Sequence, residues 1–341
     1  MPLFLSIREN LEEREHERLD PSAAFSDSSR GRARPFLDEV DDMRTCYQRD
    51  TDRIVHCKAF RRLMHKTQVF LNPEGDHYRT RMTHTIEVAR IGRTVARALR
   101  LNEDLTEAAA MGHDLGHTPF GHAGEDALTD CLGKPFRHNE QSLRVVDYLE
   151  NNGNGLNLTY EVRMAILGHT GDRIPETKEG QIVRLADRIA YVNHDIDDAI
   201  RAGILSEKSL PRSAVMVLGE THGQRINTLV NDLVMSSMAN NDISLSTDVA
   251  AALQEMRTFL FEKVYRNPVA KGEEVKAKDM LRRMYDYYIK HIDKLPADFQ
   301  PQISFEGLER TVCDYIAGMT DNYAVDKFSE IFTPKGWHVR G

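Results

Sequence analysis

The sequence predicts an all-α protein, and three observations carry this prediction. Apolar residues recur at steps of three and four through most of the chain, which is the spacing of a helix face. Residues 206–341 contain helical patterns throughout, and only one short segment, 67–71, favours a strand. The 341 residues are enough for one large domain or two ordinary ones. We therefore expect a flexible N-terminal arm over residues 1–35, a helical core over 36–205 and a C-terminal helical region over 206–341 packed on that core.

The composition is that of a globular protein, with 40% hydrophobic and 29% charged residues. The net charge of −8 argues against a general nucleic-acid coat, so an anionic substrate would need a local basic pocket. No apolar run approaches the length that spans a membrane, and we expect no membrane partner. The cysteines form no CxxC pair, which indicates reduced, buried thiols in a cytoplasmic protein. They are Cys46, Cys57, Cys131 and Cys313.

The segment before the core is polar and irregular. Residues 21–35 have the Ser-, Arg- and Pro-rich composition of a flexible arm. Residues 51–66 predict a basic helix, and such a run is more often a solvated face than the wall of an anion pocket. The β-prone residues 67–71, a turn at 72–76 and residues 77–81 together predict a short β-hairpin.

The next predicted helix begins with Thr83 as its cap. His84, Val88 and Val95 recur on one face of it, so His84 lies at the N-terminal end of a buried stripe. A lone histidine in such a place is more often a satisfied core residue than a ligand, and the helix alone does not decide between the two.

Residues 107–125 (EAAAMGHDLGHTPFGHAGE) hold five ionisable side chains that could act at a metal or phosphate site: His113, Asp114, His117, His122 and Glu125. A run of three alanines predicts a helix that ends near His113 and Asp114. Four glycines and a proline then predict a tight loop that carries His117, His122 and Glu125 past the helix end. The remaining helices of the core look arranged to complete a site around this segment.

A long helix predicted over residues 181–202 carries a second polar pattern. Asp187, Tyr191 and Asp195 lie at steps of four along one side, and apolar residues occupy the opposite side. By itself this stripe is as readily a solvated face as a functional one. Further helices are predicted over residues 139–150, 160–167, 211–219, 222–239, 247–265, 273–294 and 305–331.

Two histidines and two carboxylates suggest a metal centre. His84, His113, Asp114 and Asp187 form a complete ligand set for a divalent transition metal, with positions left for water and substrate. They come from different predicted helices, so the site requires that helix packing brings them together. The pair His194–Asp195 repeats the dipeptide but has no comparable partners, and we assign it no metal role.

This order of ligands resembles the HD superfamily of metal-dependent phosphohydrolases. The surrounding motifs look like its dGTPase or dNTP triphosphohydrolase branch, and the resemblance covers most of residues 40–330. An HD helical core is the fold that it implies. The motifs that carry the resemblance are residues 59–63 (AFRRL), 66–69 (KTQV), 79–84 (RTRMTH), 113–125 (HDLGHTPFGHAGE), 138–142 (HNEQS), 184–191 (RLADRIAY) and 317–321 (AGMTD).

The resemblance implies cleavage of a deoxynucleoside triphosphate at the α-phosphorus, which gives deoxynucleoside and inorganic triphosphate. His122 would be the catalytic histidine, as the acid for the 5′-oxygen or as an aid to attack, and Glu125 would hold its tautomer. The alternative for Glu125 is a first-turn helix charge. Tyr191 would lie under the sugar, where it leaves little room for a 2′-hydroxyl, and His169 either supports the site or merely ends a helix. The substrate contacts would be Arg81, His117, His138 and Arg188 for the triphosphate, and Gln68 and Asp195 for the 3′-hydroxyl.

The cofactor and partners follow from the same resemblance. The expected cofactor is a divalent metal, Mg²⁺ or Mn²⁺, although two histidines also suit Fe, Co or Ni. We expect a homo-oligomer, such as a hexamer or an assembly of dimers, with a nucleotide activator at an interface. Two alternatives stay open at this point. One is an HD-type 5′-nucleotidase or guanosine-tetraphosphate hydrolase, and the other is a non-catalytic binder of nucleotides or, weakly, of single-stranded nucleic acid.

Overall fold

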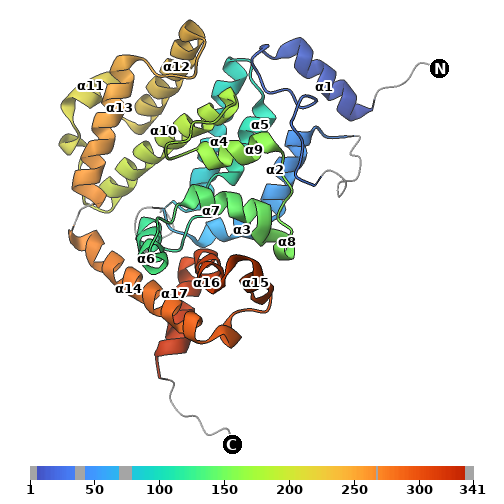
Figure 1. Ribbon diagram of the computed structural model, residues 1–341. Coiled ribbons are helices and arrows are strands. Elements are labelled where there is room, and N and C mark those ends of the chain that lie inside the picture. The colour runs from blue at the N-terminus through green and yellow to red at the C-terminus, as the bar shows by residue number, and fades with distance from the viewer. Residues whose placement is uncertain (1–5, 35–42, 69–78, 266–267, 335–341) are drawn as a thin grey trace, which may run out of the picture.

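The computed structural model describes residues 6–34, 43–68, 79–265 and 268–334 (Figure 1). The all-α prediction is confirmed, because the described residues are mostly helical and contain no named strand. The predicted β-hairpin is not supported. An isolated antiparallel bridge joins Thr67 to Thr80, and residues 69–78, where the turn was expected, lie outside the described part. None of the described helices is both long and apolar enough to cross a membrane.

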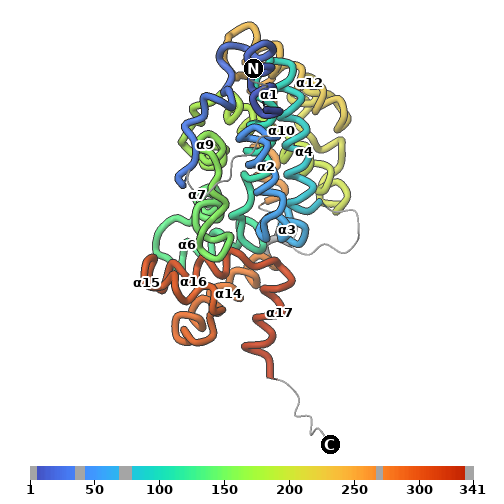
Figure 2. The backbone as a smooth tube through the Cα atoms, turned by 90° about the vertical axis from the view of Figure 1, so that its right-hand side faces the viewer, coloured from blue at the N-terminus to red at the C-terminus, as the bar shows by residue number. Residues whose placement is uncertain are grey.

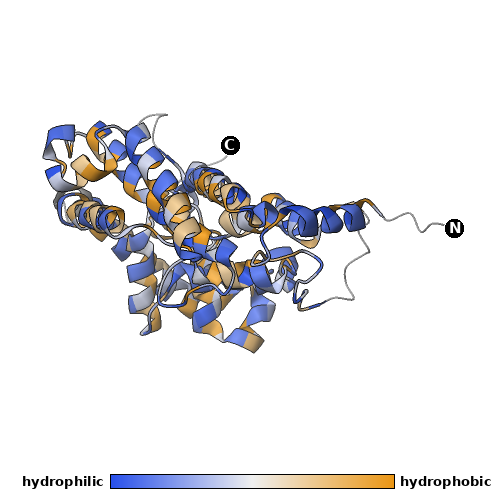
Figure 3. Cartoon of the chain, turned by 90° about the horizontal axis from the view of Figure 1, so that it is seen from above, coloured by the Kyte–Doolittle hydropathy of each residue, from blue (hydrophilic) through white to orange (hydrophobic). Residues whose placement is uncertain are grey.

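The N-terminal segment corrects one prediction. Residues 6–34 were expected to be irregular, but Ile7–Arg18 form helix α1, which Ser6 and Glu9 close with a reciprocal capping box. The helix has no buried residue and is almost wholly hydrophilic (Figure 3). The segment after it is tied to the core, since Arg32 pairs with the buried Asp50. It is therefore a structured extension in this part rather than a free arm.

The predicted basic helix over 51–66 is divided in the structure. Helix α2 (Cys46–His56) ends where Cys57 turns to an extended conformation, and α3 (Lys58–Arg62) and a 3₁₀ turn (Leu63–His65) follow. The sulfur of Cys57 accepts a hydrogen bond from the amide of Phe60 and so caps α3. The break lets this segment fold over the core, where Tyr47, Ile54 and Leu63 are buried.

Four helices form the centre of the molecule. Helix α4 (Arg81–Ala98) packs against α5 (Glu103–Gly112) and α10 (Lys178–Arg201), and α9 (Tyr160–Gly168) packs against α5 and α10 (Figures 1 and 2). Small residues on the facing sides allow close approach of the helices, and they lie in one buried cluster. These are Ala89, Ala109, Ala110, Ala165, Ala186 and Ala190. Helix α4 begins after Thr80 rather than Thr83, which instead completes a capping box with Thr80.

Shorter helices line one side of this centre. Helix α6 (His122–Leu132) follows the Gly-rich loop, and α7 (His138–Arg144) follows a short loop. A π-helical turn (Val145–Leu149) and α8 (Glu150–Gly153) end this part, so the helix predicted over 139–150 is not a single α-helix.

The C-terminal region is helical, as predicted, and packs on the core in two places. Helices α11 (Arg212–Leu218), α12 (His222–Asn240) and α13 (Thr247–Leu260) share an apolar cluster with α10, and a π-helical turn (Phe261–Tyr265) ends this group. Helices α14 (Pro268–Lys290), α15 (Ile303–Glu306), α16 (Leu308–Ala317) and α17 (Asp321–Phe332) gather against α6 (Figure 1). In Figure 1 the first group lies at the upper left of the core and the second lies below it. The boundaries 1–35, 36–205 and 206–341 stay a prediction.

Candidate metal centre and substrate site

The structure brings the four predicted metal ligands together. His84 lies in the first turn of α4, His113 and Asp114 lie where α5 ends, and Asp187 lies on α10. Ligand atoms of His84, His113 and Asp114 all lie within 4.8 Å of one another, and all three residues are buried. Oδ1 of Asp187 is 3.0 Å from Nε2 of His84 and 3.8 Å from Nε2 of His113. Three helices thus deliver two imidazoles and two carboxylates to one place.

The orientation of His113 suits a ligand. Its Nδ1 donates a hydrogen bond of 2.6 Å to the carbonyl oxygen of Ala110, which fixes the tautomer that leaves a lone pair on Nε2. That Nε2 is buried and has no hydrogen-bond partner among the described residues. A buried imidazole nitrogen without a hydrogen-bond partner, beside two carboxylates, is the arrangement that binds a divalent cation.

Both carboxylates of the cluster are ionised. Burial opposes ionisation of Asp187, but the hydrogen bond from His84 and the proximity of His113 lower its pKa to about 2. Burial also opposes ionisation of Asp114, and there His113 and Arg81 hold the pKa well below its usual range. Two buried negative charges at one place require positive charge nearby. Arg81 provides part of it, since its Nη1 donates to Oδ2 of Asp114 at 2.8 Å.

A second group of histidines lies beside this cluster. Ligand atoms of Asp114, His117 and His138 also lie within 4.8 Å of one another, and the rings of His117 and His138 stack with centroids 4.6 Å apart. The guanidinium of Arg81 on Asp114 disfavours a second cation at this place. Cationic and hydrogen-bonding groups of this kind suit a phosphate chain instead.

Glu125 does not orient His122, which corrects that expectation. Its Oε1 accepts hydrogen bonds from Nδ1 of His138 at 2.6 Å and from the backbone amide of the same residue at 3.0 Å. The carboxylate therefore caps α7 and fixes the His138 ring at once. Burial would lower the pKa of His138, but the charge and hydrogen bond of Glu125 raise it. His138 is thus the more readily protonated ring, whereas burial and Arg81 hold the pKa of His117 well below its usual range.

His122 lies on the solvent side of this group. It is the first residue of α6, its side chain is exposed, and its ring stacks on His117 with centroids 5.7 Å apart. Partial desolvation, aided by the nearby His138, lowers the pKa of His122. The ring is therefore neutral near pH 7 and accessible to a bound molecule.

His169 belongs to the same group rather than merely ending α9. Its Nδ1 donates to the carbonyl oxygen of Ile166 at 2.7 Å, and its Nε2 lies 3.2 Å from Nε2 of His138. Its ring also meets that of His113 edge-on at 5.0 Å. Burial and the neighbouring histidines lower the pKa of His169 to about 3. Its ring is therefore neutral, and it lies between His113 of the metal cluster and His138 of the second histidine group.

The stripe on α10 faces the interior rather than solvent. Asp195 is buried, and burial raises its pKa to about 7. It accepts a hydrogen bond from the hydroxyl of Tyr265, while its Oδ1 is buried without a partner among the described residues. Gln68, the last residue described before the gap at 69–78, likewise has a buried, unpartnered Oε1. Both oxygens are free to accept a hydrogen bond from a ligand.

A cavity of about 190 Å³ opens beside Tyr191 and Arg188. Its other walls come from α13 and from the loop before it, including Arg257. Arg257 and Tyr265 were missed by the sequence reasoning, because a periodic pattern places both on a helix with no sign of the partner they face. They are the C-terminal region's contribution to this end of the site.

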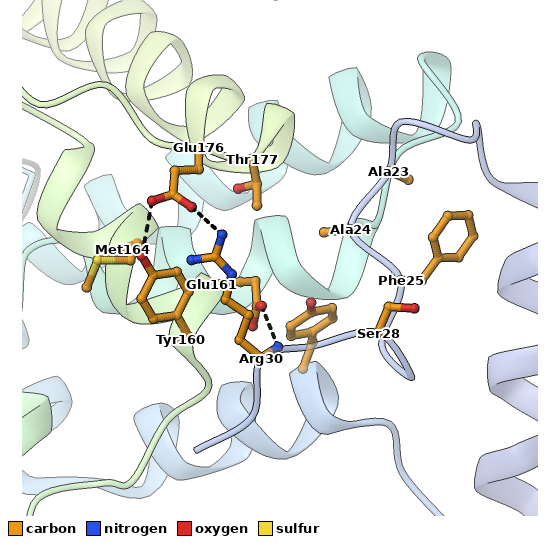
Figure 4. Close-up of a pocket in the computed structure, with 11 residues that line it drawn as sticks. Ala23, Ala24, Phe25, Ser28, Arg30, Tyr160, Glu161, Met164, Glu176 and Thr177 are labelled. Atoms are coloured by element: carbon orange, nitrogen blue, oxygen red, sulfur yellow. Dashed lines mark hydrogen bonds and ion pairs between the residues drawn. The ribbon is translucent and has the colours of Figure 1, made fainter. Parts of the chain in front are cut away.

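A larger cavity, of about 300 Å³, lies elsewhere, between the N-terminal extension and α9 (Figure 4). Its charged groups satisfy one another: Arg30 pairs with Glu176 at 2.9 Å and lies over the ring of Tyr160, whose hydroxyl donates to Glu176 at 3.0 Å. None of the histidines of the site lines it. The larger of these two cavities is therefore not the one beside the candidate site residues.

Comparison with known proteins agrees with the geometry. The family model described as HD domain matches residues 81–192, and the one described as phosphohydrolase-associated domain matches residues 243–330. A protein of Caldanaerobacter subterraneus subsp. tengcongensis, named deoxyguanosinetriphosphate triphosphohydrolase-like protein, is 55% identical over 333 residues, or 98% of each chain. The chain belongs to the deoxyguanosinetriphosphate triphosphohydrolase-like family.

Other relatives with the same name cover nearly the whole chain. The protein of Clostridium perfringens strain SM101 is 49% identical over 97% of this chain and 99% of its own. That of Bordetella pertussis is 39% identical over 90% and 95%. These matches support a phosphohydrolase of the HD type, and all four predicted ligands, from His84 to Asp187, fall inside the matched HD domain.

Proposed function

We propose that this member of the family hydrolyses deoxynucleoside triphosphates, dGTP or dNTPs generally, to deoxynucleoside and inorganic triphosphate. The proposal rests on one observation, the convergence of His84, His113, Asp114 and Asp187 at one place. The neighbouring groups, which lower the pKa of both carboxylates, support it. A divalent cation held by these four side chains would polarise a phosphate oxygen and acidify a water molecule. Two nitrogen and two oxygen ligands suit Mn, Fe, Co or Ni, and Mg²⁺ when substrate phosphates complete its shell.

The triphosphate would lie along the basic and imidazole groups beside this cluster. It carries about four negative charges near neutral pH, as judged from the acidity of phosphate groups. Arg81 and His138 supply positive charge there, His117 supplies a neutral hydrogen-bonding ring, and Arg188 extends the positive wall along α10. This local field overcomes the net charge of −8.

His122 would exchange a proton with the reacting oxygens. Its ring is neutral and exposed, and it stacks on His117, so it lies next to the proposed phosphate chain. A neutral imidazole is a base that can assist attack, and once protonated it can pass the proton to the 5′-oxygen of the leaving deoxynucleoside.

The sugar would lie at the Tyr191 end of the α10 stripe. The ring of Tyr191 lines the cavity on α10, and there it would form the floor under the sugar, leave little room for a 2′-hydroxyl and so favour deoxyribose. The unpartnered oxygens of Asp195 and Gln68 would accept a hydrogen bond from the 3′-hydroxyl, and Tyr265 would hold Asp195 for that contact.

The decisive experiment follows the products. Purified protein with Mn²⁺ or Mg²⁺ is incubated with each dNTP, each NTP, dGMP and guanosine tetraphosphate, and the phosphorus products are separated by ion chromatography. Tripolyphosphate from dNTPs, in preference to NTPs, supports the proposal. Orthophosphate from dGMP would indicate a 5′-nucleotidase, pyrophosphate from guanosine tetraphosphate would indicate that hydrolase, and retention of nucleotide or single-stranded DNA without turnover would indicate a binder.

A further inference from the structure

The loop between the metal cluster and His122 is held by residues that come from distant parts of the chain. Ser142 accepts a hydrogen bond from the amide of Gly116 at 2.9 Å and donates to the carbonyl oxygen of His113 at 2.7 Å. The buried ammonium of Lys66 donates to the carbonyl oxygens of His117 and Ala317. These contacts hold the first half of the loop.

Asp321 holds the second half. It is the first residue of α17 and is 3% exposed. Its Oδ1 accepts a hydrogen bond of 3.0 Å from the amide of Phe120. Its Oδ2 accepts two from Thr67, 3.1 Å from the amide and 2.7 Å from the hydroxyl. One carboxylate thus joins the last α-helix to two segments that lie 53 positions apart in the chain, at 67 and 120.

Both segments lead directly into the proposed substrate site. Phe120 has a φ of 61°, a backbone conformation that residues other than glycine rarely adopt. Gly121 and His122 follow it directly. Thr67 precedes Gln68. The two segments also lie close together, since a Cβ added at Gly121 would come within 3.7 Å of the carbonyl oxygen of Gln68. A carboxylate that fixes Phe120 and Thr67 therefore fixes the starting points of His122 and Gln68.

We propose that Asp321 is the positioning residue that sets the distance between the catalytic histidine and the sugar contact. The inference rests on the proposed function for the roles of His122 and Gln68, and it deepens that function by giving the C-terminal region a part in catalysis. Asp321 itself touches neither substrate nor metal ligands. Its effect is carried by the backbone at Phe120 and Thr67.

The test compares two buried carboxylates of the same chemistry. Asp321→Asn keeps the shape but replaces one accepting oxygen with an NH2 donor, which then faces either the amide of Phe120 or the amide and hydroxyl of Thr67. Asp50→Asn is the control for folding, because Asp50 is also buried and its Oδ2 likewise accepts from the amide and the hydroxyl of one threonine, Thr159, at 2.8 and 2.6 Å. It differs from Asp321 in that its Oδ1 pairs with Arg32. That control lies in the N-terminal half and touches no proposed site residue. Thr67→Val is a milder second variant that removes only the hydroxyl donor.

The measurements separate positioning from folding. For each variant we would determine kcat and KM for dGTP, the metal content, the thermal midpoint and the amide exchange of peptides that cover residues 116–125. We expect Asp321→Asn to lose about 10- to 100-fold in kcat, with wild-type metal content and faster exchange in this loop. Asp50→Asn should lower the thermal midpoint at least as much, because it also leaves Arg32 without its carboxylate, with unchanged kcat and loop exchange. Thr67→Val should lose kcat in the same direction by a smaller factor.

Equal kcat in the two asparagine variants, or unchanged exchange of residues 116–125 in both Asp321→Asn and Thr67→Val, would overturn the inference. Failure of the proposed function would look different. In that case the wild-type protein releases no tripolyphosphate, while the loop exchange still reports whether Asp321 holds Phe120 in place.

Discussion

Asp187 offers the sharpest test of the metal centre. Its pKa is lowered from an ordinary 3.8 to about 2, which corresponds to a net preference of about 2 kcal/mol for the ionised form in the folded protein. Asp187→Asn removes that charge at nearly constant volume. In chelator-treated protein at pH 7, we expect the free energy of unfolding to fall by about 2 kcal/mol, because His84 and His113 lose their ionised partner.

The sign of the pH dependence follows from the lowered pKa. Stability from Asp187 is fully present above its unfolded value of 3.8 and is lost as the pH falls toward about 2. The difference between wild type and Asp187→Asn, measured by urea unfolding, should therefore be constant from pH 7 down to about 4.5 and shrink below it. The opposite trend, a difference that grows on acidification, would contradict the assigned interaction.

Metal binding and turnover provide the functional half of the same test. Asp187→Asn should lose bound Mn²⁺ in metal analysis and lose at least about 10³-fold in kcat, since electrostatic groups at a reacting phosphate each contribute factors of this size. Asp197→Asn is the control, because Asp197 lies on the same helix but pairs with His222 at 2.9 Å instead of the cluster. A variant that lacks the Asp187 carboxylate yet binds one equivalent of metal and turns over dNTP at the wild-type rate would refute the ligand assignment.

Three further outcomes are expected. His122→Ala should lower kcat by about 10²–10⁴-fold with wild-type metal content, and a variant that keeps its kcat and its pH–rate profile would exclude a proton-transfer role. Tyr191→Ala should admit NTPs, so the ratio of kcat/KM for dGTP over GTP falls by about 10-fold or more; an unchanged ratio would mean that another group senses the 2′ position. Burial raises the pKa of Asp195 to about 7, so between pH 4 and 7 the folded state holds a proton that the unfolded state releases. The free energy of unfolding of wild type relative to Asp195→Asn should therefore fall as the pH rises from 4 to 7. The fall is at most about 1.4 kcal/mol per pH unit. Parallel unfolding curves over that range would show that Asp195 titrates normally.

The helices could be predicted from the sequence because their signals are local. Apolar spacing predicted the helix over 181–202, and the structure has Lys178–Arg201. The irregular interpretation of residues 6–34 overlooked a local signal as well, since Ser6 and Glu9 form the S-x-x-E pattern of a capping box. The break at Cys57 has no such signal, because it depends on how α2 and α3 fit over the core.

The candidate site was predictable to the extent that its ligands stand in one motif order. The partners of those ligands were not. Glu125, three residues after His122, was expected from the resemblance to hold the His122 tautomer, yet it hydrogen-bonds to His138, which helix packing carries to it. Tyr265 reaches Asp195 across 70 positions, and no spacing rule relates the two.

The charges of the candidate site divide its side chains into two adjoining groups, one that favours a cation and one that favours an anion. On one side, the ionised Asp114 and Asp187 lie beside imidazole nitrogens, and this group favours binding of a cation. On the other, Arg81 and the readily protonated His138 call for an anion. Asp114 belongs to both groups, because it lies with His113 on one side and accepts from Arg81 on the other. A cation and a polyphosphate bound side by side would neutralise each other's field, so each half of the site stabilises occupancy of the other half.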